Sequence, residues 1–331
     1  MVRAVAEQPL VTICIPTYNR PEMLRESLQS VLWQSYQHLE VIVSDNASDT
    51  ETAAVVESFG DDRVRVDRLE SNIGLHGNLS RCLHLGTGKY RVMLPDDDLM
   101  LPGNIESKVA FFEQHPQVGL VHSAFRYVNS DSLPYGPVTN WTNATKDSVQ
   151  PGFAYIGESI AQGGITCVSS VMLRSDLVVD ESFVVEDGPY CDLALWLRLA
   201  LRGDVGFLTA PLSGYRVHAS SASSSFQTMQ QVRGRVVLTR QHADALKLAF
   251  GRFLENADLD PESRAEYMRL QRASDRRMRL AIVVHRYLPG PVRKLAKRLL
   301  GWAKHGRIYQ AMSLYSAYAP GPLQEGKAPE G

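Results

Sequence analysis

The strongest constraint on the fold is an alternation of apolar runs and helical patterns over the first hundred residues. Residues 10–18 ("LVTICIPTY") and 39–46 ("LEVIVSDN") are apolar and β-branched, as in strands buried on both faces of a parallel sheet. Residues 20–36, between them, have helical apolar spacing, with Pro21 suited to a first turn. Residues 90–98 form another such run. Repeated strand–helix units predict an α/β fold with a mostly parallel central sheet and right-handed crossovers.

Beyond residue 100 the pattern is less regular. We expect helices over residues 104–116 and 191–204, and strands over residues 118–128, 167–176 and 205–218. Residues 130–152 are rich in Ser, Pro, Gly and Asn and are expected to form a long loop of the kind that often binds ligands. After a serine-rich linker at 219–225, we expect helices over 226–256 and from Pro261 onward, then a basic segment and a disordered tail at 318–331.

Composition excludes several classes of protein. The four cysteines are scattered without a CxxC pair, so neither a disulfide framework nor a zinc site is expected. The amino terminus lacks the apolar core of a signal peptide. No stretch approaches the ~18–20 apolar residues that a membrane-spanning helix needs. We therefore expect a cytoplasmic protein.

Three consecutive aspartates, Asp96–Asp98, end the apolar run at residues 90–98. Like charges in a partly desolvated place repel one another, so this triplet is either an exposed turn or a cation site. Carboxylates are the oxygen ligands that Mg²⁺ and Mn²⁺ prefer, and substrate phosphates often complete the magnesium shell. Because ligands bind at the carboxyl ends of parallel strands, we favour the cation.

Other polar side chains follow the neighbouring strands and indicate a nucleotide. Asp45 and Asn46, after the second run, can hydrogen-bond a base or a ribose. No GxGxxG follows the first strand and no GxxxxGK[ST] occurs, so neither a classical dinucleotide fold nor a P-loop enzyme is expected. The ligand would then be held by metal and side chains rather than by a glycine-rich loop.

Residues 13–50 and 72–98 resemble the GT-A nucleotide-diphospho-sugar glycosyltransferases, specifically the large inverting family 2. The resemblance rests on the order of P-T-Y-N-R, D-N-A-S-D, N-x-G, T-G-K-Y and the acidic triplet, and it covers roughly residues 9–220. The nucleotide-sugar-binding residues that it implies are Pro16, Thr17, Asn19, Asp45, Asn46, Asn72, Asp96 and Asp97. The implied Mg²⁺ or Mn²⁺ ligands are Asp98, Asp96 and His218, and Arg216 is a further candidate for the diphosphate.

The resemblance also implies a general base, since an acceptor hydroxyl needs to lose its proton during attack. The segment "CDLALWLRL" makes Asp192 the candidate, although family members often carry a second acidic residue where this chain has Cys191. Glu186 and Asp187 are the substitutes if the register differs. A purely structural role for Asp192 would be the N-cap of the following helix. Trp196 is expected in the core.

The carboxyl-terminal fifth is strongly basic. Residues 276–310 hold ten Lys or Arg and no Asp or Glu, and residues 291–306 have the apolar spacing of an amphipathic helix. Such a helix can lie on an anionic membrane, dock on its own catalytic domain or form a dimer contact. No recognised fold supports nucleic-acid binding.

The resemblance thus implies an inverting, metal-dependent transferase that adds one hexose or deoxyhexose from a UDP- or dTDP-sugar to a hydroxyl of a glycan or lipid-linked acceptor. It also implies a place in bacterial cell-surface polysaccharide synthesis. Residues 1–225 would form the catalytic domain, divided into a donor part (9–100) and an acceptor part (101–220), and residues 226–317 a helical region. The alternatives are a sugar-nucleotide nucleotidyltransferase and a non-catalytic nucleotide-sugar-binding protein. Peripheral contact with an anionic membrane and formation of a homodimer are left open in each case.

Overall fold

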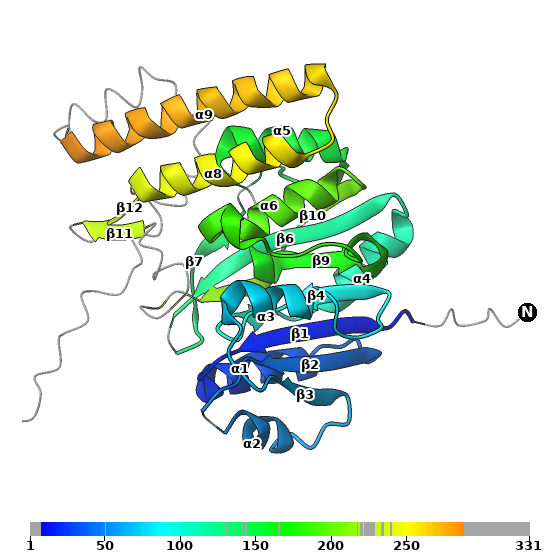
Figure 1. The fold of residues 1–331 in the computed structure, drawn as a ribbon. Coiled ribbons are helices and arrows are strands. Elements are labelled where there is room, and N and C mark those ends of the chain that lie inside the picture. Colours follow the sequence, from blue (N-terminus) through cyan, green and yellow to red (C-terminus); the bar gives the residue numbers. More distant parts are fainter. Residues whose placement is uncertain are drawn as a thin grey trace, which may run out of the picture.

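One twisted β-sheet with helices on both faces organises the protein (Figure 1). The structure is a computed structural model that describes residues 8–49, 51–129, 131–140, 142, 144–164, 166–216, 218, 221, 229–232, 235–238 and 240–287. The strands of the sheet are β1 (Val11–Thr17), β2 (Leu39–Asp45), β3 (Val64–Arg68), β4 (Tyr90–Met93), β5 (Leu99–Met100), β6 (Val118–Val128), β7 (Pro134–Thr139), β8 (Ser148–Gln150), β9 (Val171–Arg174) and β10 (Asp204–Arg216).

The sheet is parallel in its amino-terminal half and mixed beyond it. The strand order is β3-β2-β1-β4-β9-β6-β10-β5, with β7 added beside β6 and β8 beside β10. The pairs β3–β2, β2–β1 and β1–β4 are parallel, whereas β9 runs antiparallel to both β4 and β6. Strands β6 and β10 are again parallel. The predicted α/β class is confirmed, and the antiparallel pairs are confined to the half beyond β4.

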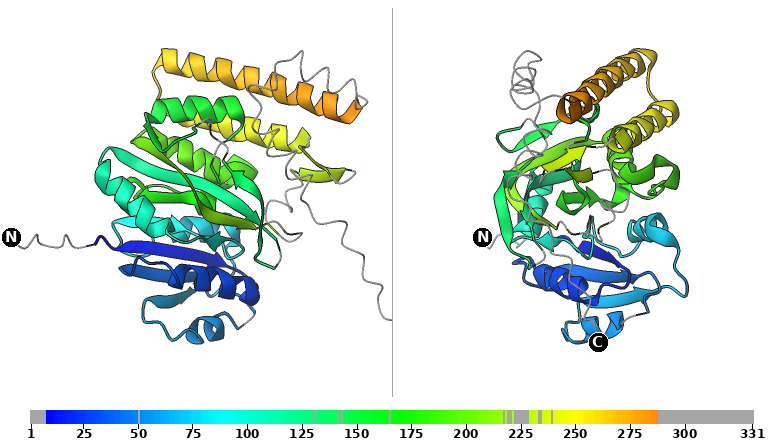
Figure 2. Two further views of the ribbon diagram at one scale, coloured as in Figure 1. Left: turned by 180° about the vertical axis from the view of Figure 1, so that it is seen from behind. Right: turned by 90° about the vertical axis from the view of Figure 1, so that its left-hand side faces the viewer.

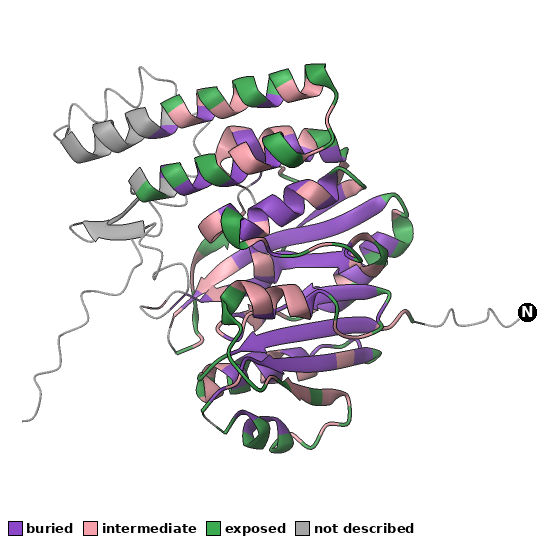
Figure 3. Cartoon of the chain, in the orientation of Figure 1, coloured by how far each residue is buried: buried purple, intermediate pink, exposed green. Residues whose placement is uncertain are grey.

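Helices pack on both faces of this sheet. They are α1 (Pro21–Leu32), α2 (Thr52–Glu57), α3 (Gly74–Cys82), α4 (Asn104–Gln114), α5 (Gly152–Gln162), α6 (Cys191–Ala200), α8 (Arg240–Asn256) and α9 (Pro261–Tyr287), with 3₁₀ turns η1 (Val168–Ser170), η2 (Ser175–Leu177) and η3 (Val185–Tyr190). Leu24, Leu28 and Val31 of α1 pack on one face of the sheet, at the i, i+4, i+7 spacing of an amphipathic helix. Helices α5 and α6 cover the other face, and α9 packs on α5 and α8 outside them. Figure 3 shows the central strands buried and the outward helix faces exposed.

Helices α8 and α9 share the core of the sheet rather than forming a separate one. Leu246 and Phe250 of α8 lie in the same buried cluster as Trp196 of α6. The hydroxyl of Tyr267, on α9, donates to the carbonyl oxygen of Phe153 at 3.0 Å. Figure 2 shows α8 and α9 stacked beside α5 in both views. In the described part of the chain, no helix combines the length and the apolar character needed to cross a membrane.

Two expected features are wrong in part. The loop expected at 130–152 contains β7 and β8, because the edges of β6 and β10 supply hydrogen-bond partners that the local composition does not indicate. The helix expected over 226–256 is preceded by a hairpin, β11 (Met229–Val232) paired with β12 (Arg235–Leu238), which carries β-branched valines. The expected linker except Ser221, the amphipathic segment 291–306 and the tail 318–331 lie outside the described residues.

Candidate active site

Polar loops follow β1, β2 and β4 at the same edge of the sheet. The three strands are parallel neighbours, and Thr17 at the end of β1 is in register with Asp45 at the end of β2. The acidic triplet follows β4, and the carbonyl oxygen of Cys14 accepts a hydrogen bond from the nitrogen of Leu94 at 3.0 Å, so that the triplet leaves the sheet beside Thr17. This is the edge at which parallel sheets bind ligands.

Asp45 is fully buried and only one of its two carboxylate oxygens is hydrogen-bonded. Its Oδ1 accepts from the backbone nitrogen of Ser48 at 3.0 Å and from the Ser48 hydroxyl at 2.5 Å. Its Oδ2 has no hydrogen-bond donor among the described residues, and the nearest cation is Arg68, whose Nε lies 3.9 Å away. A buried acceptor left unsatisfied costs about 1–3 kcal/mol, so a hydrogen-bond donor that reached this oxygen would be favoured.

The three asparagines near Asp45 hold the loops together. Asn19 has a left-handed backbone (φ 56°), its nitrogen donates to Ser48 Oγ, and its side-chain oxygen accepts from the nitrogen of Asp49 at 2.8 Å. Asn46 Nδ2 donates to Asn72 Oδ1 at 3.0 Å, and Asn46 Oδ1 accepts from the nitrogen of Ile73. These side chains brace one another, and Pro16 is buried within β1.

Within the acidic triplet, Asp96 and Asp98 are committed to internal hydrogen bonds. Thr17 Oγ1 donates to Asp96 at 2.7 Å. Asp98 accepts from the Ser169 hydroxyl at 2.5 Å and from the backbone nitrogen of Arg216 at 2.8 Å, with 2% of the residue exposed. Burial, together with the charge of Asp97, raises the pKa of Asp96 to about 6 and raises the pKa of Asp98 well above its usual range.

Asp97 has the more exposed side chain of the two triplet residues that form ion pairs, Asp96 and Asp97. Its Oδ2 lies 3.0 Å from His218 Nε2 and 3.1 Å from Arg20 Nη1, and 15% of its side chain is exposed, compared with 6% for Asp96. Arg20 also reaches Asp96 at 3.2 Å and so bridges the two carboxylates. The side chain of the triplet that faces the loop edge is therefore Asp97.

These contacts test whether the expected ligands fit a divalent cation. Within the described residues, no three His, Cys, Asp or Glu side chains converge as a metal site, so the expected set of Asp96, Asp98 and His218 does not form one. In this structure the oxygens of Asp96 and Asp98 accept hydrogen bonds from Thr17, Ser169 and Arg216. Asp97 Oδ2 is itself paired with His218 Nε2 and Arg20, so a cation bound beside Asp97 and His218 would replace these contacts and take further ligands from substrate phosphates.

Arg216 has a structural place instead of facing a ligand. Its guanidinium donates to the carbonyl oxygen of Asp97 at 2.7 Å, to Glu26 Oε2 at 2.6 Å and to Ser132 Oγ at 2.8 Å. Only 1% of the side chain is exposed. Arg216 thus ties the end of β10 to the acidic triplet and to α1.

Asp192 lies in the first turn of α6, and Tyr190 rather than Asp192 is the N-cap residue. Helix α6 leads into β10 through three residues, so it runs back along the sheet and its first turn lies toward the carboxyl edge (Figure 1). Burial raises the pKa of Asp192 to about 6, although its carboxylate accepts a hydrogen bond from the nitrogen of Leu193 at 2.8 Å. A carboxylate of that pKa is matched to proton abstraction near neutral pH.

The two substitutes for Asp192 are differently placed. Asp187 is bound by two guanidinium groups, Arg198 at 3.1 Å and Arg252 at 3.0 Å, and its side chain is 5% exposed. Glu186 is exposed. Asp187 is therefore held in two ion pairs. Asp192 is buried and forms no ion pair among the described residues.

Sequence reasoning missed Arg20 and Arg68. Arg20 follows the P-T-Y-N motif directly, so its proximity to the triplet could have been inferred from the shared sheet edge. Arg68 ends the half-exposed strand β3, and the parallel pairing of β3 with β2 places it opposite Asp45. An alternating strand indicates only which face is buried, so nothing in the sequence singled out Arg68.

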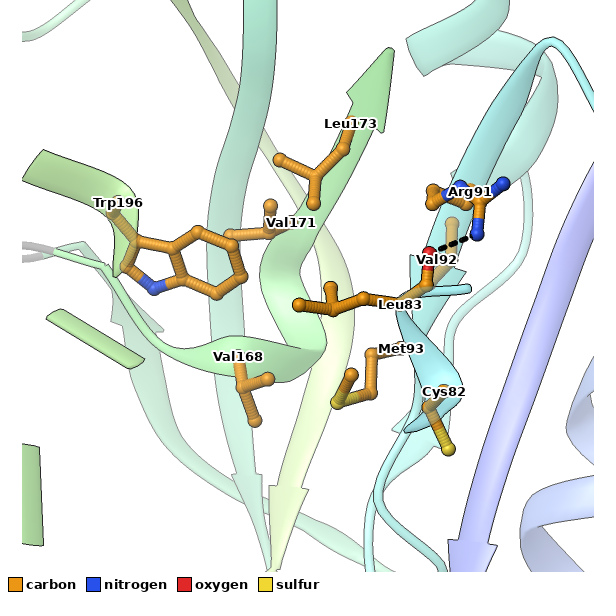
Figure 4. A pocket seen from close by; sticks show the side chains of 9 residues that line it. All are labelled: Cys82, Leu83, Arg91, Val92, Met93, Val168, Val171, Leu173 and Trp196. Atoms are coloured by element: carbon orange, nitrogen blue, oxygen red, sulfur yellow. Dashed lines mark hydrogen bonds between the residues drawn. The ribbon is translucent and has the colours of Figure 1, made fainter. Parts of the chain in front are cut away.

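A separate small cavity lies in the core and not at this edge. Figure 4 shows it between β4 and α6, lined by apolar side chains that include Leu83, Met93 and Val171. The indole of Trp196 lines the cavity, is 1% exposed as expected, and its Nε1 has no hydrogen-bond partner among the described residues. The cavity is a packing defect between core layers and lacks the carboxylates of the edge.

The chain is similar to known bacterial proteins over most of its length. The model of glycosyl transferase family 2 matches residues 12–174. The putative glycosyltransferase EpsE of Bacillus subtilis is 27% identical over 259 residues, covering 74% of this chain and 86% of EpsE. The UDP-Glc:alpha-D-GlcNAc-diphosphoundecaprenol beta-1,3-glucosyltransferase WfaP of Escherichia coli is 27% identical, covering 65% of this chain and 80% of WfaP.

Solved structures share the fold. TarS 1-349 of S. aureus in complex with UDP aligns with a TM-score of 0.57 at 18% identity, covering 84% of this chain and 75% of that one. This chain covers 43% of the longer TarS chain. The mannosyltransferase PcManGT of Pyrobaculum calidifontis, in complex with GDP-Man and Mn²⁺, aligns with a TM-score of 0.55 at 15% identity, covering 94% of this chain and 86% of that one. Residues 12–174 therefore belong to glycosyl transferase family 2, and the related sequences and the shared fold make the chain a glycosyltransferase with the GT-A fold.

Proposed function

We propose that this glycosyltransferase transfers one sugar, with inversion, from a UDP- or dTDP-linked donor to a hydroxyl of a glycan or lipid-linked acceptor. The observation that carries the proposal is the placement of three different carboxylates at one edge of the sheet: Asp45 with a free oxygen, Asp97 facing the edge, and Asp192 with a raised pKa. Each suits one part of the reaction, namely base recognition, diphosphate binding and proton abstraction.

Asp45 and Arg68 suit a pyrimidine base. Uracil and thymine present one N–H between two carbonyl oxygens, so Asp45 Oδ2 would accept from N3–H while Arg68, 3.9 Å away, donates to a carbonyl. Guanine presents O6 beside N1–H in the same way, but its amino group on the other side of N1–H needs a second acceptor, and Asp45 Oδ1 already accepts from Ser48. TarS in complex with UDP agrees with a pyrimidine nucleotide, whereas PcManGT is in complex with GDP-Man, so the preference rests on Asp45 and Arg68.

Asp97 and His218 would hold Mg²⁺ or Mn²⁺ together with the donor diphosphate, which agrees with the Mn²⁺ of PcManGT. When bound, the cation would neutralise charge on the departing diphosphate. Asp96 and Asp98 would act through position: their hydrogen bonds to Thr17, Ser169 and Arg216 fix the backbone that presents Asp97.

Asp192 would act as the general base. The acceptor oxygen forms a bond to the anomeric carbon, the bond from that carbon to the diphosphate oxygen breaks, and Asp192 takes the hydroxyl proton. A single displacement from the face opposite the diphosphate converts an α-linked donor into a β-linked product. The β-linkage in the printed name of WfaP supports this outcome.

A lipid-linked acceptor fits both the relatives and the charge of the carboxyl-terminal segment. WfaP is named for a diphosphoundecaprenol-linked acceptor. The ten cationic side chains in residues 276–310 would hold the enzyme at an anionic membrane surface, near such substrates. Addition of a single sugar for cell-surface polysaccharide is the role that these features support.

The test is a transfer assay with UDP-, dTDP- and GDP-sugars, Mn²⁺ or Mg²⁺, and a synthetic GlcNAc-diphospho-lipid acceptor, followed by proton NMR of the product. We expect turnover with a pyrimidine-linked donor and a β anomeric signal. An α-linked product would rule out the single displacement, and nucleotide binding without any transfer to hydroxyl acceptors would favour a binding protein.

A further inference from the structure

The segment before Asp192, residues 181–190, is held on three sides, and we call it the strap. Its centre is Asp187, whose Oδ2 lies 3.1 Å from Arg198 Nη1 of α6 and whose Oδ1 lies 3.0 Å from Arg252 Nε of α8. The Asp187 side chain is 5% exposed. A nearly buried carboxylate between two guanidinium groups is stable only while at least one of them remains.

Helix α6 holds the strap along its length. Arg198 donates to Glu181 Oε2 at 2.8 Å and to the carbonyl oxygen of Ser182 at 2.7 Å, in addition to its ion pair with Asp187. Arg202 forms a second ion pair with Glu181. The strap therefore folds back beside the helix whose first turn carries Asp192, and it ends at Tyr190, the N-cap of that helix.

The strap also passes between α3, on the donor side, and α8. The backbone nitrogen of Phe183 donates to Ser80 Oγ of α3 at 2.9 Å. Gly188 has φ 71° and ψ −149°, a conformation that only glycine adopts readily, and a Cβ there would lie 3.4 Å from Leu248 Cδ2 of α8. Its carbonyl oxygen lies 3.5 Å from His76 Nε2 of α3. The turn directly before Asp192 is thus fitted between two helices that are far apart in sequence.

We propose that Arg252 is a positioning residue: its ion pair with Asp187 anchors the strap to α8 and so sets where Asp192 meets the acceptor hydroxyl. This inference rests on the proposed function of Asp192. It makes α8, which lies beyond the family match at residues 12–174, a part of the active site. Because Arg198 still neutralises Asp187 when Arg252 is lost, the strap loses its outer anchor while the fold is kept.

The experiment compares Arg252→Gln and Arg252→Lys with wild type in the full chain. The readouts are kcat for sugar transfer, the Kd for UDP with Mn²⁺, and Tm. The matched control is Arg269→Gln on α9. The Arg269 side chain is 74% exposed, and its ion pair with Glu266 is long, at 3.9 Å. We expect Arg252→Gln to lower kcat about tenfold, in line with the large cost of small misplacements, to change the UDP Kd less than about twofold, and Arg252→Lys to restore most of the rate.

An unchanged kcat in a folded Arg252→Gln variant would overturn the inference. So would a rate loss that Lys does not restore, or a fall in Tm that accounts for the loss in both variants, because either would assign Arg252 to stability alone. Failure of the proposed function is distinguishable, since wild type itself would then bind no UDP or transfer no sugar. The control is expected to behave as wild type in all three readouts.

Discussion

The donor part and the acceptor part of this protein hold their candidate side chains in different ways. Around β1, β2 and β4, short polar side chains of adjacent loops hydrogen-bond one another, as in the contacts of Asn19 with Ser48 and Asn46 with Asn72. Around Asp192, the support comes from ion pairs to helices that follow the strap in the chain: Asp187 pairs with Arg198 of α6 and with Arg252 of α8. The donor loops are therefore determined by motifs at strand ends, whereas the acceptor side depends on helices added later in the chain.

The largest effect should come from Asp192. Replacing it by Asn removes the proton acceptor but keeps the size of the side chain, and we expect transfer to fall about 10²–10⁴-fold. UDP affinity, measured by calorimetry, should stay at the wild-type value, because the donor loops are untouched. Glu186→Gln, at an exposed carboxylate six residues earlier, is the matched control. A variant that lost UDP binding as well would show that the two parts are not separable.

Within the acidic triplet, we expect Asp97 to matter for ligand binding and Asp98 to matter for stability. Asp97→Asn removes the carboxylate that faces His218, so metal-dependent UDP binding should weaken about tenfold, or about 1.4 kcal/mol, with Tm unchanged. Asp98→Ala leaves the Arg216 nitrogen and the Ser169 hydroxyl unpaired, and the free energy of unfolding should fall by about 1–3 kcal/mol. Exposed Asp62→Asn is the control. The reverse pattern would make Asp98 the ligand-facing residue.

Arg68 tests base selectivity within the donor part. Arg68→Gln removes the cation beside Asp45, and we expect UDP affinity to fall about threefold to tenfold, since charge-assisted hydrogen bonds exceed neutral ones by about 1 kcal/mol. GDP affinity should change less, so the ratio of UDP affinity to GDP affinity should fall. Arg65→Gln, exposed on the same strand, provides the comparison. Equal losses of affinity for UDP and GDP would mean that Arg68 interacts with the charge of the phosphates and not with the base.

The smallest effect concerns pH. Because burial raises the pKa of Asp192 to about 6, above its unfolded value, the folded state binds more protons than the unfolded state between roughly pH 4 and 6, and the contribution of this group to stability falls as pH rises through that window. Transfer should change oppositely, falling below about pH 6 as the base is protonated. At pH 7.5, Asp192→Asn should melt a few degrees, about 2–4 °C, above wild type.

That difference in Tm should shrink to about half at pH 5, because the carboxyl is then largely protonated in the folded protein but still largely ionised in the unfolded chain. Melting curves of both proteins at the two pH values check it, with transfer rates measured on the same samples. A constant difference in Tm would mean that Asp192 titrates with its ordinary pKa.

The sequence was most informative where side-chain chemistry follows directly from a strand end. Asp45, Thr17 and the triplet could be placed at one edge because parallel strands bring their carboxyl ends together. The division between Asp97 and Asp98 could not be read, because it depends on Ser169 and Arg216, which arrive from distant elements. For the same reason the strap was not foreseen: Asp187 appeared as a substitute base, and only tertiary packing brings Arg198 and Arg252 to it.

Prediction of secondary structure was wrong where contacts with distant parts of the chain determine the element. Strand β8 is short, and its hydrogen bonds come from β10 rather than from any pattern of its own. Helix α5 begins at Gly152, where a Cβ would lie 1.7 Å from the carbonyl oxygen of Ala200 at the end of α6, so close packing of two helices determines that start. The local sequence indicates neither the pairing of β8 with β10 nor the packing of Gly152 against the end of α6.

The most direct test of the central claim is a calorimetric titration of UDP into the full chain, in Mn²⁺ and in EDTA, for wild type and Asp97→Asn. We expect wild type to bind UDP in Mn²⁺ and to bind it about tenfold more weakly in EDTA, and we expect UDP binding by Asp97→Asn to respond little to the metal. Equal binding of UDP by both proteins in both buffers would contradict the assignment of Asp97 and His218. No binding by folded wild type would contradict the proposed donor site.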